Sequence, residues 1–212
     1  MSESLLRSVH HVPGVRGFVR KQVLRVVARG VEWTTKLPGK RALNVSQVNP
    51  WLHVGGSVSR ARYGELKARG ITCVIDLRAE RWDDREALAA LGIELLHLPV
   101  TDRYPPSVEQ LSQGVNWALP RLDAGGVLYA HCEHGVGRGP LMGLAVMVAR
   151  GWDAPEAYRA VRHARWQATL NDRQLRGLAD FVAAWTGVPE KAAWAAGPAA
   201  RRSPSARPST GC

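Results

Sequence analysis

The stretch "VLYAHCEHGVGRGP", residues 127–140, decides what kind of fold this chain can adopt. It begins with an apolar run whose length and composition are typical of a buried β-strand. It ends at Pro140, a residue suited to the first turn of a helix. The residues between them therefore predict a loop that joins the carboxyl end of a strand to the N-terminus of a helix. The sheets of α/β proteins bind their ligands at such places.

The rest of the chain alternates in the same way. Short apolar runs with β-branched residues predict further strands, and segments with apolar residues three or four positions apart predict helices between them. The expected strands are 51–56, 71–78, 93–100 and 127–132, and the expected helices are 59–70, 84–92, 107–120, 140–150, 154–163 and 171–185. Strands that alternate with helices form a mostly parallel sheet. We therefore expect an α/β fold with a central, mostly parallel sheet flanked by helices.

The formal net charge of +11 on the 212 residues is unevenly distributed and divides the chain into three segments. Residues 1–44 carry +7 (nine basic and two acidic residues) and residues 188–212 carry +3, whereas residues 45–187 carry only +1. We expect residues 45–187 to form one domain, preceded by a basic segment and followed by a disordered tail rich in Pro, Ala and Ser. A nearly neutral domain offers no basic face, so we expect no nucleic-acid partner.

The basic N-terminal segment has a helical pattern over residues 15–33, with valines on one face and arginines on the other. Two interpretations are open: the valines pack on the domain, or the helix lies on an anionic membrane surface. No run approaches the ~18 apolar residues of a membrane span, and a secretory signal pattern is absent. The three cysteines have neither disulfide nor metal-ligand spacing, as in a reducing compartment. We expect a cytoplasmic protein, with peripheral membrane contact through residues 15–33 as the alternative.

The segment 132–138, called the cysteine loop below, has the composition of an anion-binding site. Gly135 and Gly137 let backbone N–H groups converge on one point, at the positive end of the following helix dipole. Arg138 offers a planar fork of donors for two oxygens of a tetrahedral oxyanion. The same surroundings lower the pKa of a thiol, so we expect Cys132 to be a thiolate aimed at phosphorus.

A phosphate ester attacked by a thiolate also needs a proton for its leaving oxygen. Asp102 is the best candidate for this general acid, because it lies in the polar loop "TDRYPPS" that follows the strand 93–100. The carboxyl ends of parallel strands meet at one edge of a sheet, so we expect this loop to face the cysteine loop.

The chain from Val45 to Trp185 resembles the cysteine-dependent protein tyrosine phosphatases, and within them the compact dual-specificity branch. The matching motifs are "HC" and "GVGR" in the cysteine loop, "HLPVTD" at 97–102 and "ELKARGITCVIDLRAE" at 65–80. The resemblance implies that Cys132 forms a phosphocysteine, that Asp102 protonates the leaving group and then activates water, and that His131 supports the thiolate. It implies no metal and no cofactor. The residues that it assigns to phosphate binding are Glu133, His134, Gly135, Val136, Gly137 and Arg138.

Two residues depart from the family pattern. Gly139 stands where the family has a Ser or Thr hydroxyl that assists breakdown of the phosphocysteine, so two alternatives are open for this step: a water takes the place of the hydroxyl, or release of phosphate is slow. If Gly139 is the defect, a serine at this position is expected to raise turnover. Glu133 puts a carboxylate directly after the nucleophile, and we expect it to repel polyphosphoinositides, with a protonated His134 as a partial offset.

The remaining candidates have structural explanations. Cys73 lies in an apolar strand, so we expect it to belong to the core, and a disulfide with Cys132 is the less favoured alternative. His97 is expected to be structural. Arg162 and Arg165, in "VRHARWQATLN", resemble a family segment that supports the active site, and we assign them no direct contact with substrate.

These residues predict a phosphomonoester hydrolase, acting as a protein tyrosine or dual-specificity phosphatase. Two alternatives remain open at this point. The substrate could be a phospholipid or a small phosphorylated metabolite at a membrane surface, or the protein could be a phosphate-binding module with weak turnover because of Gly139.

Overall fold

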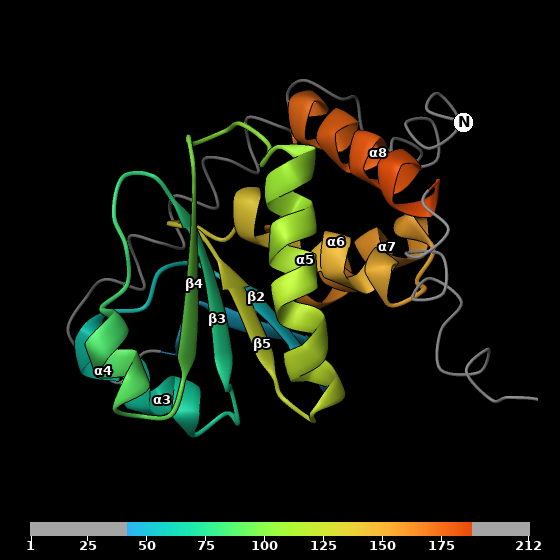
Figure 1. Cartoon of the computed structure of the whole chain (residues 1–212). Coiled ribbons are helices and arrows are strands. Elements are labelled where there is room, and N and C mark those ends of the chain that lie inside the picture. Colours follow the sequence, from blue (N-terminus) through green and yellow to red (C-terminus); the bar gives the residue numbers. More distant parts are fainter. Residues whose placement is uncertain (1–41, 188–212) are drawn as a thin grey trace, which may run out of the picture.

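The computed structural model describes residues 42–187. Their strands form one sheet with the order β1-β2-β5-β3-β4 (Figure 1), in which only the β1–β2 pair is antiparallel. The prediction of a mostly parallel sheet is confirmed. The strands are β1 (Val45–Asn49), β2 (Leu52–Gly55), β3 (Cys73–Arg78), β4 (Glu94–Val100) and β5 (Leu128–His131). Strand β1 was not predicted, because an antiparallel edge strand that is half-buried lacks a continuous apolar run.

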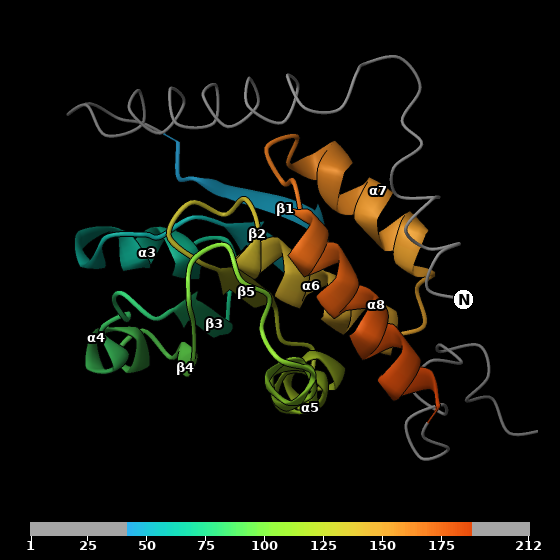
Figure 2. The same cartoon turned by 90° about the horizontal axis from the view of Figure 1, so that it is seen from above.

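Helices cover both faces of this sheet (Figure 2). The short helices α3 (Tyr63–Lys67) and α4 (Arg85–Ala89) lie on one face, with the single 3-10 turn Arg60–Arg62 before α3. The longer helices lie on the other face and at the β1 edge of the sheet. They are α5 (Val108–Asp123), α6 (Arg138–Ala149), α7 (Ala154–Ala164) and α8 (Asp172–Thr186).

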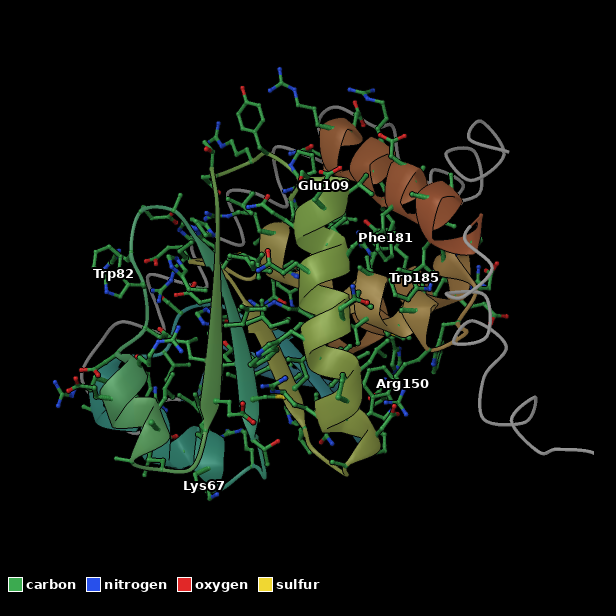
Figure 3. All side chains as sticks on the ribbon, viewed as in Figure 1. Lys67, Trp82, Glu109, Arg150, Phe181 and Trp185 are labelled. Carbon is green, nitrogen blue, oxygen red and sulfur yellow. The ribbon has the colours of Figure 1, made fainter. Side chains whose placement is uncertain are left out.

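Helix α6 is the centre of the larger core. All of its residues are buried, because it packs against β2 and β5 on one side and against α5, α7 and α8 on the other. A helix that is apolar all round is typical of such a position. In Figure 3 the side chains of Phe181 and Trp185 lie between α8 and α6. Their rings stack with centroids 5.5 Å apart.

Two predicted helix boundaries were wrong. Helix α6 begins at Arg138 rather than near Pro140, because glycines at 137 and 139 allow the chain to turn earlier; Pro140 still falls in the first turn, where its missing N–H costs nothing. Helix α5 continues past Pro120 to Asp123. Only one turn follows this proline, and the helix is held at its start by a capping box between Ser107 and Gln110.

The predictions for the flanks lie outside the described residues. This applies to the helix at 15–33, to the tail at 188–212 and to Cys212, and the domain boundaries at 44/45 and 187/188 stay predictions. Within residues 42–187, none of the helices is both long and apolar enough to cross a bilayer.

Candidate active site

Three loops meet at the carboxyl edge of the parallel strands. Strand β5 lies between β2 and β3, and the cysteine loop leaves its end. The β3–α4 loop (residues 79–84) leaves the neighbouring strand β3, and the β4–α5 loop (residues 101–107) leaves β4, the next strand beyond β3, in the same direction. The nucleophile candidate Cys132 is 3 % exposed at the bottom of this region.

The carbonyl groups of the cysteine loop are fastened to the surrounding scaffold. Ser57 donates its backbone N–H to one of them, the guanidinium of Arg165 donates to two, and the backbone N–H of Thr169 donates to a fourth. The four acceptors are the carbonyl oxygens of Glu133 (2.9 Å), His134 (2.9 Å), Gly135 (2.6 Å) and Val136 (2.9 Å). Because these consecutive carbonyls are held from outside, their N–H groups are free to turn toward Cys132, and the N–H of Gly135 lies 3.3 Å from its Sγ.

Both loop glycines lie at close approaches. Gly135 has φ +68°, and a Cβ there would lie 2.2 Å from the carbonyl carbon of Gly55 at the end of β2. A Cβ on Gly137 would lie 2.5 Å from the side-chain amide of Gln174 on α8. At Gly135 the loop can therefore take this tight course only without a side chain, whereas a side chain at position 137 would require the amide of Gln174 to move.

Arg138 is 1 % exposed, and its guanidinium is fixed from several sides. Nη1 and Nη2 donate to the two carboxylate oxygens of Glu80 at 2.9 and 2.8 Å, and Nη1 also donates to the carbonyl of Val100 at 2.7 Å. Nε is buried and has no hydrogen-bond partner among residues 42–187. The hydrogen bond from Arg138 lowers the pKa of Glu80 to about 2. The guanidinium nitrogens Nη1 and Nη2 of Arg138, which were expected to bind phosphate, are thus hydrogen-bonded to Glu80. Nε remains a donor without an acceptor among residues 42–187.

Asp102 lies where the sequence predicted a general acid. It is exposed, and its Oδ1 is 3.2 Å from Nη2 of Arg138. The neighbouring Arg103 has φ +67°, and α8 holds this part of the β4–α5 loop through a hydrogen bond from Asn171 to the carbonyl of Arg103 (2.8 Å). The structure therefore places Asp102 beside Arg138, and Arg138 in turn interacts electrostatically with Cys132.

Glu133 is paired in a way that the sequence did not indicate. Its Oε1 lies 2.8 Å from Arg81, and its Oε2 lies 3.5 Å from Nη1 of Arg78. The expectation that this carboxylate repels polyanions stays a prediction, and the contacts with Arg81 and Arg78 reduce the charge on which it rests. His134 is half-buried, and its carbonyl is one of those bound by Arg165.

Gly139 is the second residue of helix α6, which follows the cysteine loop, and it lies against the backbone of β5. A Cβ at this position would be 2.7 Å from Cα of His131, 2.9 Å from its carbonyl carbon and 3.0 Å from the oxygen of Ala130. The glycine therefore meets a packing requirement, and a serine has no space beside these strand atoms.

The other cysteine and histidine predictions agree with the structure. Cys73 is buried in β3, and burial raises the pKa of its thiol to about 11. Cys73 and Cys132 are both free thiols. His97 contacts the carbonyl of Arg78 through Nε2 at 2.7 Å, which is a structural contact between β4 and β3.

Several site residues escaped the sequence analysis. Arg165, known only as part of a supporting segment, proves to be a buried clamp on two loop carbonyls. Glu80 and Asp83 were not singled out, although acidic residues in a loop after a buried strand are a detectable signal at a sheet's carboxyl edge.

One group of potential metal ligands occurs among the described residues, namely Asp76, Asp83 and His131, all buried. Arg78 already occupies both carboxylates, with Nη2 2.8 Å from Asp76 and 2.6 Å from Asp83. A cation would have to compete with this guanidinium, so the group does not fit a metal.

Comparisons with known proteins agree with this geometry. Residues 53–151 match a family model described as a DSP-PTPase phosphatase of polymorphic toxin systems. The human phosphatidylglycerophosphatase and protein-tyrosine phosphatase 1 is 26% identical over 155 residues, which is 69% of this chain and 77% of that protein. Its rat counterpart is 30% identical over 93 residues, 43% of this chain and 48% of the relative.

Solved structures show the same architecture. Tk-PTP in its active form is 27% identical with a TM-score of 0.61, over 68% of this chain and 99% of that one. PTPMT1 in complex with PI(5)P has the same fold, with 22% identity and a TM-score of 0.64 over 68% of this chain and 97% of that one. With its cysteine loop at the carboxyl edge of a mostly parallel sheet, the chain is therefore similar to the dual-specificity branch of the cysteine-dependent protein tyrosine phosphatase superfamily.

Proposed function

We propose that this protein hydrolyses phosphate monoesters through a phosphocysteine on Cys132. The observation that carries the proposal is that the carbonyls of residues 133–136 accept hydrogen bonds from outside the loop, while the N–H of Gly135 lies 3.3 Å from the buried thiol of Cys132. Such a donor needs no reorganisation when charge develops on the transferred group.

In the first step, Sγ of Cys132 attacks phosphorus, and the bond from phosphorus to the leaving oxygen breaks. Asp102 in its protonated form gives its proton to that oxygen. In the second step, Asp102 as a carboxylate takes a proton from water, the water oxygen attacks the phosphocysteine, and inorganic phosphate leaves with the thiolate restored.

Arg138 stabilises the phosphoryl oxygens in both steps. Its unpartnered Nε donor is available without breaking any existing contact, and Nη2 lies between Glu80 and Asp102. Holding the guanidinium in advance lowers the entropic cost of gripping the transition state.

The test is an assay of an aryl phosphate with a metal chelator present, comparing wild type with Cys132→Ser and Asp102→Asn. We expect Cys132→Ser to be inactive while a thermal shift with inorganic phosphate shows that its loop still binds the anion. Cys73→Ala is the matched control, because it removes the other described thiol and is expected to keep activity. Equal rates for wild type and Cys132→Ser would refute the proposal.

For the physiological substrate, a phosphorylated protein is the first candidate and a phospholipid monoester the second. The second gains support from the pairing of Glu133 with Arg78 and Arg81, which weakens the electrostatic objection to anionic headgroups. It also gains support from the human relative, whose name includes phosphatidylglycerophosphatase. Rates on phosphatidylglycerophosphate in vesicles and on phosphotyrosine and phosphothreonine peptides separate the two.

Membrane contact through residues 15–33 belongs to the second candidate. Sedimentation with anionic vesicles, comparing the full chain with one that starts at Val45, tests it. A module with weak turnover would instead show a burst of one phosphate per chain without a steady state, and mass spectrometry would find a trapped phosphocysteine.

A further inference from the structure

His131 immediately precedes the candidate nucleophile and is completely buried. It is the last residue of β5, where it pairs with Asp76 on β3, and its ring stacks on Tyr129 with centroids 5.0 Å apart. Both ring nitrogens have partners: Nε2 lies 2.9 Å from Oδ2 of Asp83, and Nδ1 lies 3.2 Å from the carbonyl oxygen of Cys132.

These two partners determine the protonation state of the ring. A carbonyl oxygen can only accept a hydrogen bond, so Nδ1 carries a proton. An ionised carboxylate also only accepts, so Nε2 carries one as well. Asp83 is held in the ionised form because its Oδ1 accepts a hydrogen bond of 2.6 Å from Arg78. An imidazole with protons on both nitrogens is a cation.

The charges around this ring lead to the same conclusion. The groups that face His131 are Asp76 and Arg78 from β3, Asp83 from the β3–α4 loop and Tyr129 in its own strand. The buried carboxylates of Asp76 and Asp83 share the guanidinium of Arg78, which Glu133 also contacts at 3.5 Å, so with a neutral His131 the carboxylates outnumber the guanidinium that they share. A protonated His131 offsets this excess of buried negative charge, which avoids the cost of burying an unpaired charge.

The direction of the pKa shift agrees with the geometry. Burial lowers the pKa of His131, but the hydrogen bond and charge of Asp83, helped by Asp76, outweigh burial and raise it above its ordinary value. Burial would raise the pKa of Asp83, but its contacts with His131, Arg78 and Tyr63 lower it.

We propose that Asp83 is a positioning residue that keeps His131 doubly protonated, so that a fixed positive charge beside Cys132 stabilises its thiolate. The imidazolium is bonded to the carbonyl of the nucleophile itself, and an adjacent cation increases the thiolate fraction of a cysteine. Asp83 is 4 % exposed and touches no part of the cysteine loop except through His131 and Arg78. This inference rests on the proposed function in one respect only, namely that the thiolate acts as the nucleophile in phosphate hydrolysis.

The first test is a titration of wild-type protein labelled with ¹⁵N on its histidine rings, with the His131 signal identified by its loss in His131→Asn. We expect both ring nitrogens of His131 to stay protonated to higher pH than in a free imidazole. A ring that is neutral at pH 6 would overturn the proposal, whether or not any variant folds.

The second test measures the rate at which iodoacetamide alkylates Cys132 as a function of pH, read by mass spectrometry of the peptide that contains it. We expect Asp83→Asn to slow alkylation about tenfold at pH 6 and to leave the rate at pH 9 unchanged, because only the thiolate fraction differs. Asp84→Asn is the matched control. It removes the same charge one position away, and asparagine caps α4 as well as the aspartate that now accepts a hydrogen bond from Ala87.

The outcomes separate this inference from the proposed function. Equal profiles for Asp83→Asn and wild type would overturn the role of Asp83. Equal slowing at both pH values would show general damage to the loop and would also overturn it. Alkylation does not depend on turnover, so a shifted profile in a protein without phosphatase activity would support the inference while refuting the proposed function.

Discussion

Replacing Gly139 by serine is expected to damage the protein rather than to restore a missing hydroxyl. The new Cβ would lie 2.7 Å from Cα of His131 and 3.0 Å from the oxygen of Ala130, and both are strand backbone atoms that cannot rotate away. Relief requires the start of α6 to move outward by about 1 Å, and overpacking of this kind costs roughly 1–3 kcal/mol. For a chain of this size the melting temperature should fall by about 2–12 °C.

The same displacement would move Arg138, which is the first residue of α6. A shift of about 1 Å at a catalytic group costs up to about 100-fold in rate, so turnover of an aryl phosphate should fall. Gly64→Ser is the matched control, because a Cβ at that helical glycine meets nothing within 4 Å. Calorimetry measures the change in melting temperature, and steady-state kinetics measures the change in turnover. If Gly139→Ser melted like wild type and turned over faster, the packing argument would be wrong and the missing hydroxyl would be the defect.

Three further outcomes are expected. Arg165→Ala leaves the loop carbonyls of His134 and Gly135 without these donors, so it should destabilise the protein by at least about 2 kcal/mol and lower turnover. Urea unfolding checks this, and an unchanged midpoint would contradict the role of Arg165 in holding the loop. Cys73, whose pKa is raised to about 11, should stay unmodified by iodoacetamide at pH 8 while Cys132 reacts; peptide mapping checks this, and equal labelling would be inconsistent with it. Arg138 lowers the pKa of Glu80 from 4.5 to about 2, so the stabilisation from this pair is complete above pH 4.5 and is lost as the pH falls toward 2. Glu80→Gln should flatten this acid dependence in thermal unfolding, and an unchanged slope between pH 5 and pH 2 would exclude the pair as its source.

The strands that form the centre of the sheet were predictable because their apolar runs are continuous. Strands β3 and β5 are buried along their whole length, which is the pattern that a central parallel strand requires. Strand β1 escaped prediction because its burial depends on β2 and α7, which pack against it, rather than on its own composition. The start of α6 at Arg138 was also not predicted, because glycine is a poor helix former and its place in a helix is decided by packing.

Within the site, the sequence indicated the residues whose chemistry is recognisable on its own. Cys132, Arg138 and Asp102 follow from the need for a nucleophile, an oxyanion binder and an acid at the carboxyl ends of strands in one parallel sheet. The sequence showed the absence of a hydroxyl at Gly139 but not the closeness of β5, so the packing requirement at this position could not be predicted.

The sequence by itself determined the α/β alternation, the placing of the cysteine loop between a strand and a helix, and the reactive groups, because all of these depend on local composition and periodicity. Only the tertiary structure decided which charges meet. Glu80 and Arg138 are 58 positions apart, and Asp83 and His131 are 48 positions apart. They come together because β3 and β5 pair in a register that sets Asp76 opposite His131 and brings the β3–α4 loop over the cysteine loop. Pairing of distant charges in a buried place depends on strand register and packing, which no single stretch of sequence contains.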